Sequence, residues 1–367
     1  MNSLKFIIGF LILGSVACSK NEDNLETPRT ATSAIAATAS STTSTLQGVT
    51  LKTSLPFRFG AAVNINFLKK NEAYRNLVIK EYSSLTAESG MKISVLHPAE
   101  NTWEWYDADY LVNFAIANNQ RVHGHTLIWD SSLPSWVKNY QGNAAAWEKL
   151  FKTHIQTIVG HFKGRVASWD VVNEAFNSDG TVKQTIWYKK LGSDYIARAF
   201  KYAHEADPNA ILFLNDYGHE NGNNKRRGII AYVNALVARG IPIHGLGLQM
   251  HTRYNLPDAN FAKAINESAA TGLKIHISEL DISLNPSSDQ TLTLTPELLA
   301  LQAAKYKFIV QTFNALPKSQ QFGITTWNVT DGDSWVPKNY NRPDWPLPFD
   351  STYNKKPAYQ GILDGIK

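Results

Sequence analysis

Short apolar runs alternate with longer amphipathic stretches from about residue 51 to Lys367. Apolar runs rich in β-branched residues predict buried strands, and the stretches between them have the apolar spacing of helices. The expected strands are at residues 59–64, 91–96, 121–129, 167–173, 210–215, 245–249, 274–278 and 322–327. The clearest expected helices are at residues 146–162, 194–206, 225–239 and 296–316.

Eight strands that alternate with helices predict an α/β fold of the (β/α)8 type, a TIM barrel. Residues 51–367 contain no low-complexity break, so we expect them to form a single catalytic domain. A doubly wound open sheet is the alternative. It is disfavoured because no glycine-rich phosphate-binding turn follows the first expected strand.

The first 50 residues have a different pattern. Lys5, a short apolar stretch and small residues precede Cys18, which is typical of a lipoprotein signal peptide at residues 1–17. We therefore predict export, lipidation of Cys18 and anchoring at the outer membrane or cell surface of a Gram-negative bacterium. Plain secretion with cleavage elsewhere is the alternative. Residues 18–50 are rich in Ser, Thr and Ala and predict a disordered tether.

Composition and charge narrow the possible functions. The net charge is +5 but Lys and Arg are scattered singly, which argues against a nucleic-acid partner. The 10 Trp and 15 Tyr fit either a large core or a site that stacks on flat sugar rings. The single cysteine excludes an internal disulfide, and the histidines lack zinc spacing, so we expect no metal or other cofactor.

Polar and aromatic side chains follow most of the expected strands. In a parallel barrel these positions meet at the C-terminal mouth, where barrel enzymes carry their chemistry. Glu174 follows the fourth expected strand and Glu279 the seventh, so their carboxylates should face each other across the mouth. Glycoside hydrolysis requires two such carboxyl groups around one bond. A single glutamate at a strand end is usually just solvated, but this pair within a polar ring favours catalysis.

Two motifs around these glutamates resemble the acid/base and nucleophile signatures of glycoside hydrolase family 10, the β-1,4-xylanases. They are WDVVNE at residues 169–174 and ISELD at 277–281. The resemblance continues in order through GAAV at 60–63, HGHTLIW at 123–129, FLNDY at 213–217, GLQMH at 247–251, WNVTDGDSW at 327–335 and PAY at 357–359. It covers the whole expected domain, whereas an Asn-Glu pair alone is shared with other barrel glycosidases.

The resemblance implies a monomeric, retaining endo-β-1,4-xylanase whose partner is xylan or xylooligosaccharides. Glu279 is then the nucleophile, and Glu174 protonates the leaving oxygen before it deprotonates the incoming water. His251 and Asp281 are expected to hold Glu279 in place, since residues two apart in a strand face the same side. A capping or surface role is the alternative for Asp281. Asn173 is expected to bind the 2-hydroxyl of the sugar.

The resemblance implies further contacts with the substrate. They are Glu88, Lys92, His125, Trp129, Asn215, Tyr217, Gln249, Trp327 and Trp335. The tryptophans are expected to exclude the hydroxymethyl arm that glucose has and xylose lacks. Core packing is the alternative for any single tryptophan, and a structural role is the alternative for a lone histidine such as His125.

One motif departs from the family pattern. The family usually has Glu-Asn-x-Met-Lys-Trp near the second strand, and here Ser89 replaces the Asn and Ile93 the Trp. A lost hydrogen bond costs ~0.5–1.5 kcal/mol, so the next sugar site on the non-reducing side should be weaker or reshaped. The aromatic stretch at 97–106 either rebuilds that site or fastens the second helix.

Two other functions stay open at this point. Another retaining glycanase, acting on cellulose or mixed-linkage glucan, has the same carboxylate pair. A surface glycan-binding lipoprotein on an inactive scaffold does not need both Glu174 and Glu279, so their presence argues against it.

Overall fold

The computed structural model describes residues 48–367. The predicted signal peptide, Cys18 and residues 18–47 of the predicted tether lie outside the described residues. The Tyr359 hydroxyl donates to Val49 O (3.2 Å), and the Thr50 side chain caps the first helix. The contacts of the folded domain therefore begin at Val49. Within residues 48–367, no helix is both long and apolar enough to cross a membrane.

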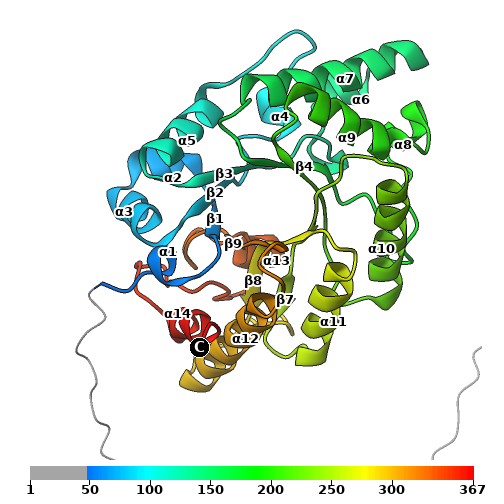
Figure 1. Cartoon of the computed structure of the whole chain (residues 1–367). Coiled ribbons are helices and arrows are strands. Elements are labelled where there is room, and N and C mark those ends of the chain that lie inside the picture. Colours follow the sequence, from blue (N-terminus) through cyan, green and yellow to red (C-terminus); the bar gives the residue numbers. More distant parts are fainter. Residues whose placement is uncertain (1–47) are drawn as a thin grey trace, which may run out of the picture. The chain divides into compact units, whose positions relative to one another are not determined.

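Eight parallel strands form a closed barrel with helices around it (Figure 1). The strands are β1 (Phe59–Val63), β2 (Ser84–Ala87), β3 (Arg121–Gly124), β4 (Ser168–Asn173), β5 (Ile211–Asp216), β6 (Gly245–Leu248), β8 (Lys274–Ser283) and β9 (Gln321–Trp327). Each strand pairs with its neighbour, and β6 pairs directly with β8. The short β7 (His251–Arg253), which follows β6 in the chain, pairs with the C-terminal part of β8. The predicted (β/α)8 fold is confirmed, and a doubly wound open sheet is excluded because the ring closes.

The helices follow the strands in the expected alternation. They are α1 (Leu51–Ser54), α2 (Ile65–Lys70), α3 (Glu72–Glu81), α4 (Ile93–Leu96), α5 (Tyr106–Ala117), α6 (Ser135–Lys138), α7 (Ala144–His161), α8 (Ile186–Leu191), α9 (Tyr195–Ala206), α10 (Asn223–Ala238), α11 (Asp258–Ala269), α12 (Pro296–Asn314), α13 (Trp335–Tyr340) and α14 (Pro357–Asp364). The four helices predicted from the sequence are confirmed. Two begin at side-chain caps, since Asn143 accepts from Ala146 N (3.0 Å) and Thr295 from Leu298 N (3.3 Å).

The barrel interior is a packed core. The rings of His123, Phe213, His276 and Phe322 have centroids 4.5–5.9 Å apart. The Arg121 guanidinium lies 3.8 Å from the centroid of the Phe322 ring. Side chains therefore fill the centre of the barrel, as is usual for an eight-stranded barrel.

The second strand is the clearest error of the sequence-based prediction. The apolar run at 91–96 predicts a strand, but the structure has β2 at Ser84–Ala87 and helix α4 at Ile93–Leu96. The prediction is wrong because β2 has no apolar run of its own. Its Ser84 Oγ accepts from Arg121 Nε inside the barrel (3.2 Å), and Thr86 alternates onto the same face. The third strand also ends earlier than expected, at Gly124 instead of residue 129.

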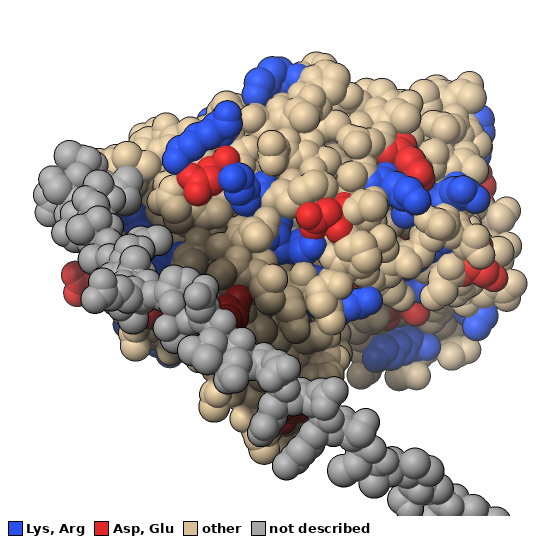
Figure 2. Space-filling view, turned by 90° about the horizontal axis from the view of Figure 1, so that it is seen from below, with Lys and Arg blue, Asp and Glu red and all other residues tan. Residues whose placement is uncertain are grey.

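On the side shown in Figure 2, Lys and Arg are interspersed with Asp and Glu, and no continuous basic area is visible. This side of the molecule therefore offers no electrostatic footprint for a nucleic acid, which requires clustered positive charge.

Candidate active site

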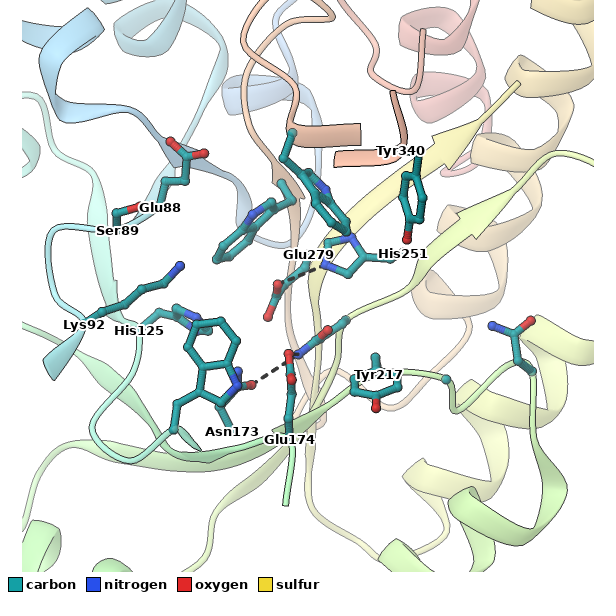
Figure 3. A pocket seen from close by; sticks show the side chains of 16 residues that line it. Glu88, Ser89, Lys92, His125, Asn173, Glu174, Tyr217, His251, Glu279 and Tyr340 are labelled. Atoms are coloured by element: carbon teal, nitrogen blue, oxygen red, sulfur yellow. Dashed lines mark hydrogen bonds and ion pairs between the residues drawn. The ribbon is translucent and has the colours of Figure 1, made fainter. Parts of the chain in front are cut away.

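A cavity of about 430 Å³ opens at the C-terminal mouth of the barrel (Figure 3). It is lined by Glu88, Ser89, Lys92, His125, Trp129, Asn173, Glu174, Tyr217, Gly218, Asn221, Gln249, His251, Glu279, Trp327, Trp335 and Tyr340. The structure thus brings twelve of the fourteen predicted site residues of this domain to one cavity. The other two, Asp281 and Asn215, do not line it and lie behind Glu279 and His251, which they contact.

Glu174 reaches the cavity through an unusual backbone conformation. Its φ is 58°, in the left-handed region that residues other than glycine rarely adopt. Glu174 N donates to Asn215 O at 2.8 Å, which ties this turn to β5. As a result, the consecutive side chains of Asn173 and Glu174 both accept from Gln249 Nε2, at 3.2 and 3.1 Å, instead of pointing to opposite faces.

Glu279 reaches the cavity through a different irregularity, in β8. Ser278 and Glu279 are consecutive, yet both contact Asn215. Ser278 Oγ donates to Asn215 Oδ1 (2.6 Å), and Asn215 Nδ2 donates to Glu279 Oε1 (2.7 Å). The register between β8 and β9 shifts between Ile277 and Leu280, so the strict alternation of a strand is interrupted here. This shift places Glu279 on the cavity side.

Three carboxamide side chains connect the two glutamates. Gln249 donates to both Glu174 and Asn173, and Asn215 Nδ2 donates to Asn173 Oδ1 (2.9 Å) as well as to Glu279. Among residues 48–367, the side-chain nitrogen Nδ2 of Asn173 makes no hydrogen bond, so it remains available to a ligand in the cavity. The network holds both carboxylates in fixed positions before any ligand enters.

His251 and Asp281 form a chain of contacts with Glu279, in the arrangement that the sequence resemblance implied. His251 lies between the two carboxylates, with Nε2 3.1 Å from Glu279 Oε2 and Nδ1 2.7 Å from Asp281 Oδ2. Burial alone would lower the pKa of His251, but Asp281 and Glu279 raise it well above its usual value. Burial alone would raise the pKa of Glu279, but the hydrogen bond with His251 and the nearby His125 lower it. Glu279 is therefore held ionised.

A second buried carboxylate lies beneath the cavity. Asp170 Oδ2 is 2.9 Å from His125 Nδ1 and 3.0 Å from His123 Nε2. Burial alone would raise the pKa of Asp170, but the two imidazoles lower it below its usual value. His125 lines the cavity, as predicted, and its contact with Asp170 fixes the orientation of its ring. The role of Asp170 was not predicted, although it lies within the motif at 169–174.

Aromatic rings and one lysine form the upper walls. Lys92 Nζ lies 5.0 Å from the Trp129 ring centroid and 5.8 Å from that of Trp327. Burial lowers the pKa of Lys92, and the nearby Glu279 partly offsets this effect. Trp335 Nε1 donates to Asp281 Oδ2 (2.7 Å), which fixes its indole over the site. On the opposite wall, the Tyr217 ring is held by Lys225, whose Nζ is 3.2 Å from the ring centroid.

The substituted positions near β2 behave differently from each other. Ser89 lines the cavity and is exposed, whereas Ile93 is 1% exposed and belongs to the core. The aromatic stretch at 97–106 fastens helices instead of lining the cavity. Trp105 stacks on Trp103 and on His161 of α7, with ring centroids 5.5 and 4.0 Å apart.

Sequence reasoning missed one prominent wall residue, Tyr340. It lies at the end of α13, five residues after Trp335, and its side chain is 50% exposed. Asn221 and Gly218, in the loop after β5, were missed as well. No periodicity marks these loop positions, because only the folding of separate loops brings them to one mouth.

Within residues 48–367, no group of three His, Cys, Asp or Glu side chains is placed to hold a metal ion.

Comparison with known proteins identifies the family of this chain. Residues 49–365 match the model of glycosyl hydrolase family 10. The chain is 37% identical to endo-1,4-beta-xylanase C of Paenibacillus barcinonensis, over 84% of this chain and 30% of that protein. It is 36% identical to exoglucanase XynX of Acetivibrio thermocellus, over 85% of this chain and 29% of that protein. The chain thus spans about a third of the length of these relatives.

A solved structure gives a comparison over nearly the whole of its chain. Xylanase 10B of Thermotoga petrophila, crystallised in complex with xylobiose, superposes with a TM-score of 0.82 at 34% identity, over 88% of this chain and 98% of that one. The family match extends through every strand of the barrel and includes Glu174 and Glu279. The chain therefore belongs to glycosyl hydrolase family 10.

Proposed function

We propose that this chain is an endo-β-1,4-xylanase that cleaves internal bonds of xylan with retention of configuration, by double displacement. The observation that carries the proposal is the pair of glutamates that share one hydrogen-bond network at the mouth of the barrel. Glu174 directly follows β4 and Glu279 lies in β8, only β5 and β6 separate these two strands, and both glutamates line the cavity. Two carboxyl groups on either side of one sugar bond are the requirement of glycoside hydrolysis.

The environments of the two glutamates support different roles for them. Glu279 is 4% exposed and held ionised by His251, which suits a nucleophile that attacks the anomeric carbon. Glu174 is half-buried and hydrogen-bonded to the neutral amide of Gln249, which suits a group that gives up a proton and later takes one from water. The free amide of Asn173 is positioned to donate to the 2-hydroxyl of the bound sugar.

Asn215 has a positioning role in this proposal. It is 0% exposed and its amide group donates to Glu279 and Asn173, so its contact with the substrate is indirect. Glu88, Lys92, His125 and Tyr217 remain proposed substrate contacts, since all four line the cavity.

The indoles around the cavity support xylan as the substrate. Trp327 and Trp335 line the cavity together with Glu279, so a hydroxymethyl arm pointing at either indole would clash, and a steric clash is an effective way to reject a substrate. The relatives are named both xylanase and exoglucanase, so a glucanase is the second candidate. Release of reducing ends from linear xylan and from cellulose separates the two. We expect activity on xylan; hydrolysis of cellulose alone would overturn the proposal.

The retaining mechanism has two direct tests. Proton NMR of the first product should show the β anomer before it mutarotates, and an initial α anomer would contradict retention. The Glu174→Ala variant should lose about 10²- to 10⁴-fold on xylan, whose leaving group needs a proton. It should lose far less in the first step with an aryl xylobioside whose phenolate leaves unaided. Equal losses on both substrates would exclude Glu174 as the acid.

We also propose that the mature protein is exported and anchored through a lipid on Cys18. The support is the basic, apolar and small-residue pattern that precedes the cysteine. Metabolic labelling with a radioactive fatty acid should mark the wild type and not the Cys18→Ala variant, and whole cells should hydrolyse added xylan. Equal labelling of both chains would contradict lipidation at this residue.

A further inference from the structure

A second cavity of about 200 Å³ adjoins the candidate active site. The two cavities share His251, Trp335 and Tyr340, so they meet beside the glutamates. We call the second cavity the side lobe, and its characteristic residues are Arg253, Ser283 and Arg342. Its volume is less than half of the main cavity's about 430 Å³, which suits a substituent better than a further stretch of polysaccharide.

The strands explain why the side lobe opens onto the site. β7 pairs with β8 in parallel, with His251 opposite Asp281 and Arg253 opposite Ser283. Side chains two residues apart in a strand point to the same face, so Arg253 lies on the same face as His251, one step farther from Glu279. A backbone sugar at Glu279 therefore has the side lobe next to it, within reach of a branch.

The charges of the side lobe leave one positive group without a partner. Arg342 Nη2 is 3.2 Å from Asp344 Oδ2 and also donates to Ser283 Oγ (3.0 Å), so its charge is compensated. His251 is compensated by Asp281 and Glu279. Arg253 is exposed, and among residues 48–367 it has no ion pair and no side-chain hydrogen bond. A free guanidinium at the edge of a cavity is suited to bind a carboxylate through two parallel hydrogen bonds.

One buried acid, Glu220, interacts with Arg253 without neutralising it. Glu220 is 1% exposed, and burial raises its pKa to about 7. Its carboxyl group is therefore largely protonated in mildly acidic solution, where the positive charge of Arg253 remains available. The exposed ring of Tyr340, shared by both cavities, offers an apolar face beside that charge.

We propose that the side lobe binds the carboxylate of an acidic sugar branch on the polysaccharide backbone that lies in the main cavity. This inference rests on the proposed function and narrows its substrate to uronate-decorated xylan. Arg253 supplies the charge-assisted hydrogen bonds, and Tyr340 packs against the branch ring. The ligand is a branch of the substrate, and not a free acid, because the lobe adjoins the main cavity at His251, Trp335 and Tyr340, next to the position of the backbone.

The experiment compares kcat/KM on two xylooligosaccharides of equal length, one neutral and one with a single uronate branch. In Arg253→Gln, the ratio of the acidic to the neutral kcat/KM should fall about tenfold. The matched control is Arg227→Gln, which removes the same charge from an exposed position on α10 that lines neither cavity. It should keep the wild-type ratio. The ratio of the wild type should also decrease as salt screens the attraction.

The outcomes separate the inference from the function. If the wild type hydrolyses the neutral xylooligosaccharide but Arg253→Gln keeps the wild-type ratio, Arg253 in the side lobe does not bind the acidic branch. The proposed function then stands. If the wild type hydrolyses neither substrate, the proposed function itself fails. Free glucuronate serves as a competitor. Strong inhibition of the wild type by the free acid, lost in Arg253→Gln, would show binding of a free anion and overturn the assignment to a branch.

Discussion

Two parts of the active-site cavity are built in contrasting ways. The floor consists of Asn173, Gln249 and Glu279, from the end of β4, just after β6 and within β8, together with Asn215 of β5, which lies beneath them. All four are at most 4% exposed and hydrogen-bonded to one another or to a shared partner. The β2 wall consists of Glu88, Ser89 and Lys92, of which Ser89 is exposed and, within the described part of the chain, has no side-chain hydrogen bond.

The difference shows which part of the site the fold holds rigidly. The floor residues follow neighbouring parallel strands, so each side chain is positioned by backbone pairing and by the next side chain. The β2 wall belongs to a loop between a strand and a short helix, and behind Ser89 a further cavity of about 220 Å³ begins. We infer that the fold preorganises the bond-breaking groups, whereas the adjoining sugar site depends on loop residues that change without disturbing the barrel.

The largest expected effect comes from breaking the floor at its nucleophile. Glu279→Gln keeps the size of the side chain but removes the charge and replaces one accepting oxygen with a donating NH2 group, so kcat on xylan should fall on the order of 10⁴-fold or more. Steady-state release of reducing ends measures it. Glu205→Gln is the matched control, since Glu205 is exposed and paired only with groups on the surface. A loss no larger than that of the control would contradict the role of Glu279.

A smaller effect is expected from His251→Asn. His251 lowers the pKa of Glu279, so its removal should raise that pKa and move the acid limb of the kcat/KM profile to higher pH. The sign follows because Glu279 must be ionised to attack. At neutral pH, loosening of Glu279 should reduce kcat by up to about 100-fold. His204→Asn, a change in α9 outside the cavity, should leave the profile in place, and an unmoved acid limb in His251→Asn would refute this coupling.

The packing behind the β2 wall should show in acid stability. Burial lowers the pKa of His154 to about 3, and its ring lies between Leu127 O (3.0 Å) and His97 Nδ1 (3.2 Å). Between about pH 6.5 and 3 the unfolded chain takes up a proton that the folded chain refuses, so the free energy of unfolding decreases as pH falls through this window.

The His154→Gln variant removes that proton uptake. Its free energy of unfolding should therefore fall less steeply with decreasing pH, by up to about 1.4 kcal/mol per pH unit. Urea denaturation followed by tryptophan fluorescence at several pH values between 7 and 4 measures both slopes. Parallel pH dependences for the two proteins would show that His154 does not contribute to acid sensitivity.

The smallest effect is expected from a substitution in the β2 wall. Ser89→Asn supplies a carboxamide that can hydrogen-bond the sugar in the next site on the non-reducing side. KM for short xylooligosaccharides should therefore decrease about two- to tenfold, with little change in kcat. Initial rates on xylotriose and xylotetraose test this. Ser193→Asn, at an exposed position in the turn before α9, serves as the control. An unchanged KM in Ser89→Asn would mean that the wall was reshaped elsewhere.

The contrast between floor and wall also separates what sequence patterns predict well from what they predict poorly. The polar residues after each apolar strand were predicted correctly, because a parallel barrel brings every strand end to one mouth. The strand β2 was predicted in the wrong place, because Ser84 and Thr86 face a polar part of the interior and leave no apolar run. Tyr340 was missed because a loop position has no periodic signal.

The sequence by itself determined the (β/α)8 fold and the location of the two glutamates at the barrel mouth, because these follow from local patterns, whereas the pairing of His251 with Asp281 was expected from the resemblance to the family. Only the tertiary structure decided how Glu174 and Glu279 turn toward the cavity, through a left-handed φ at one and a register shift at the other. It alone also decided that Asn215 lies beneath the site and that Arg253 opens onto a side lobe. These features depend on contacts between segments far apart in the chain, which no local pattern encodes.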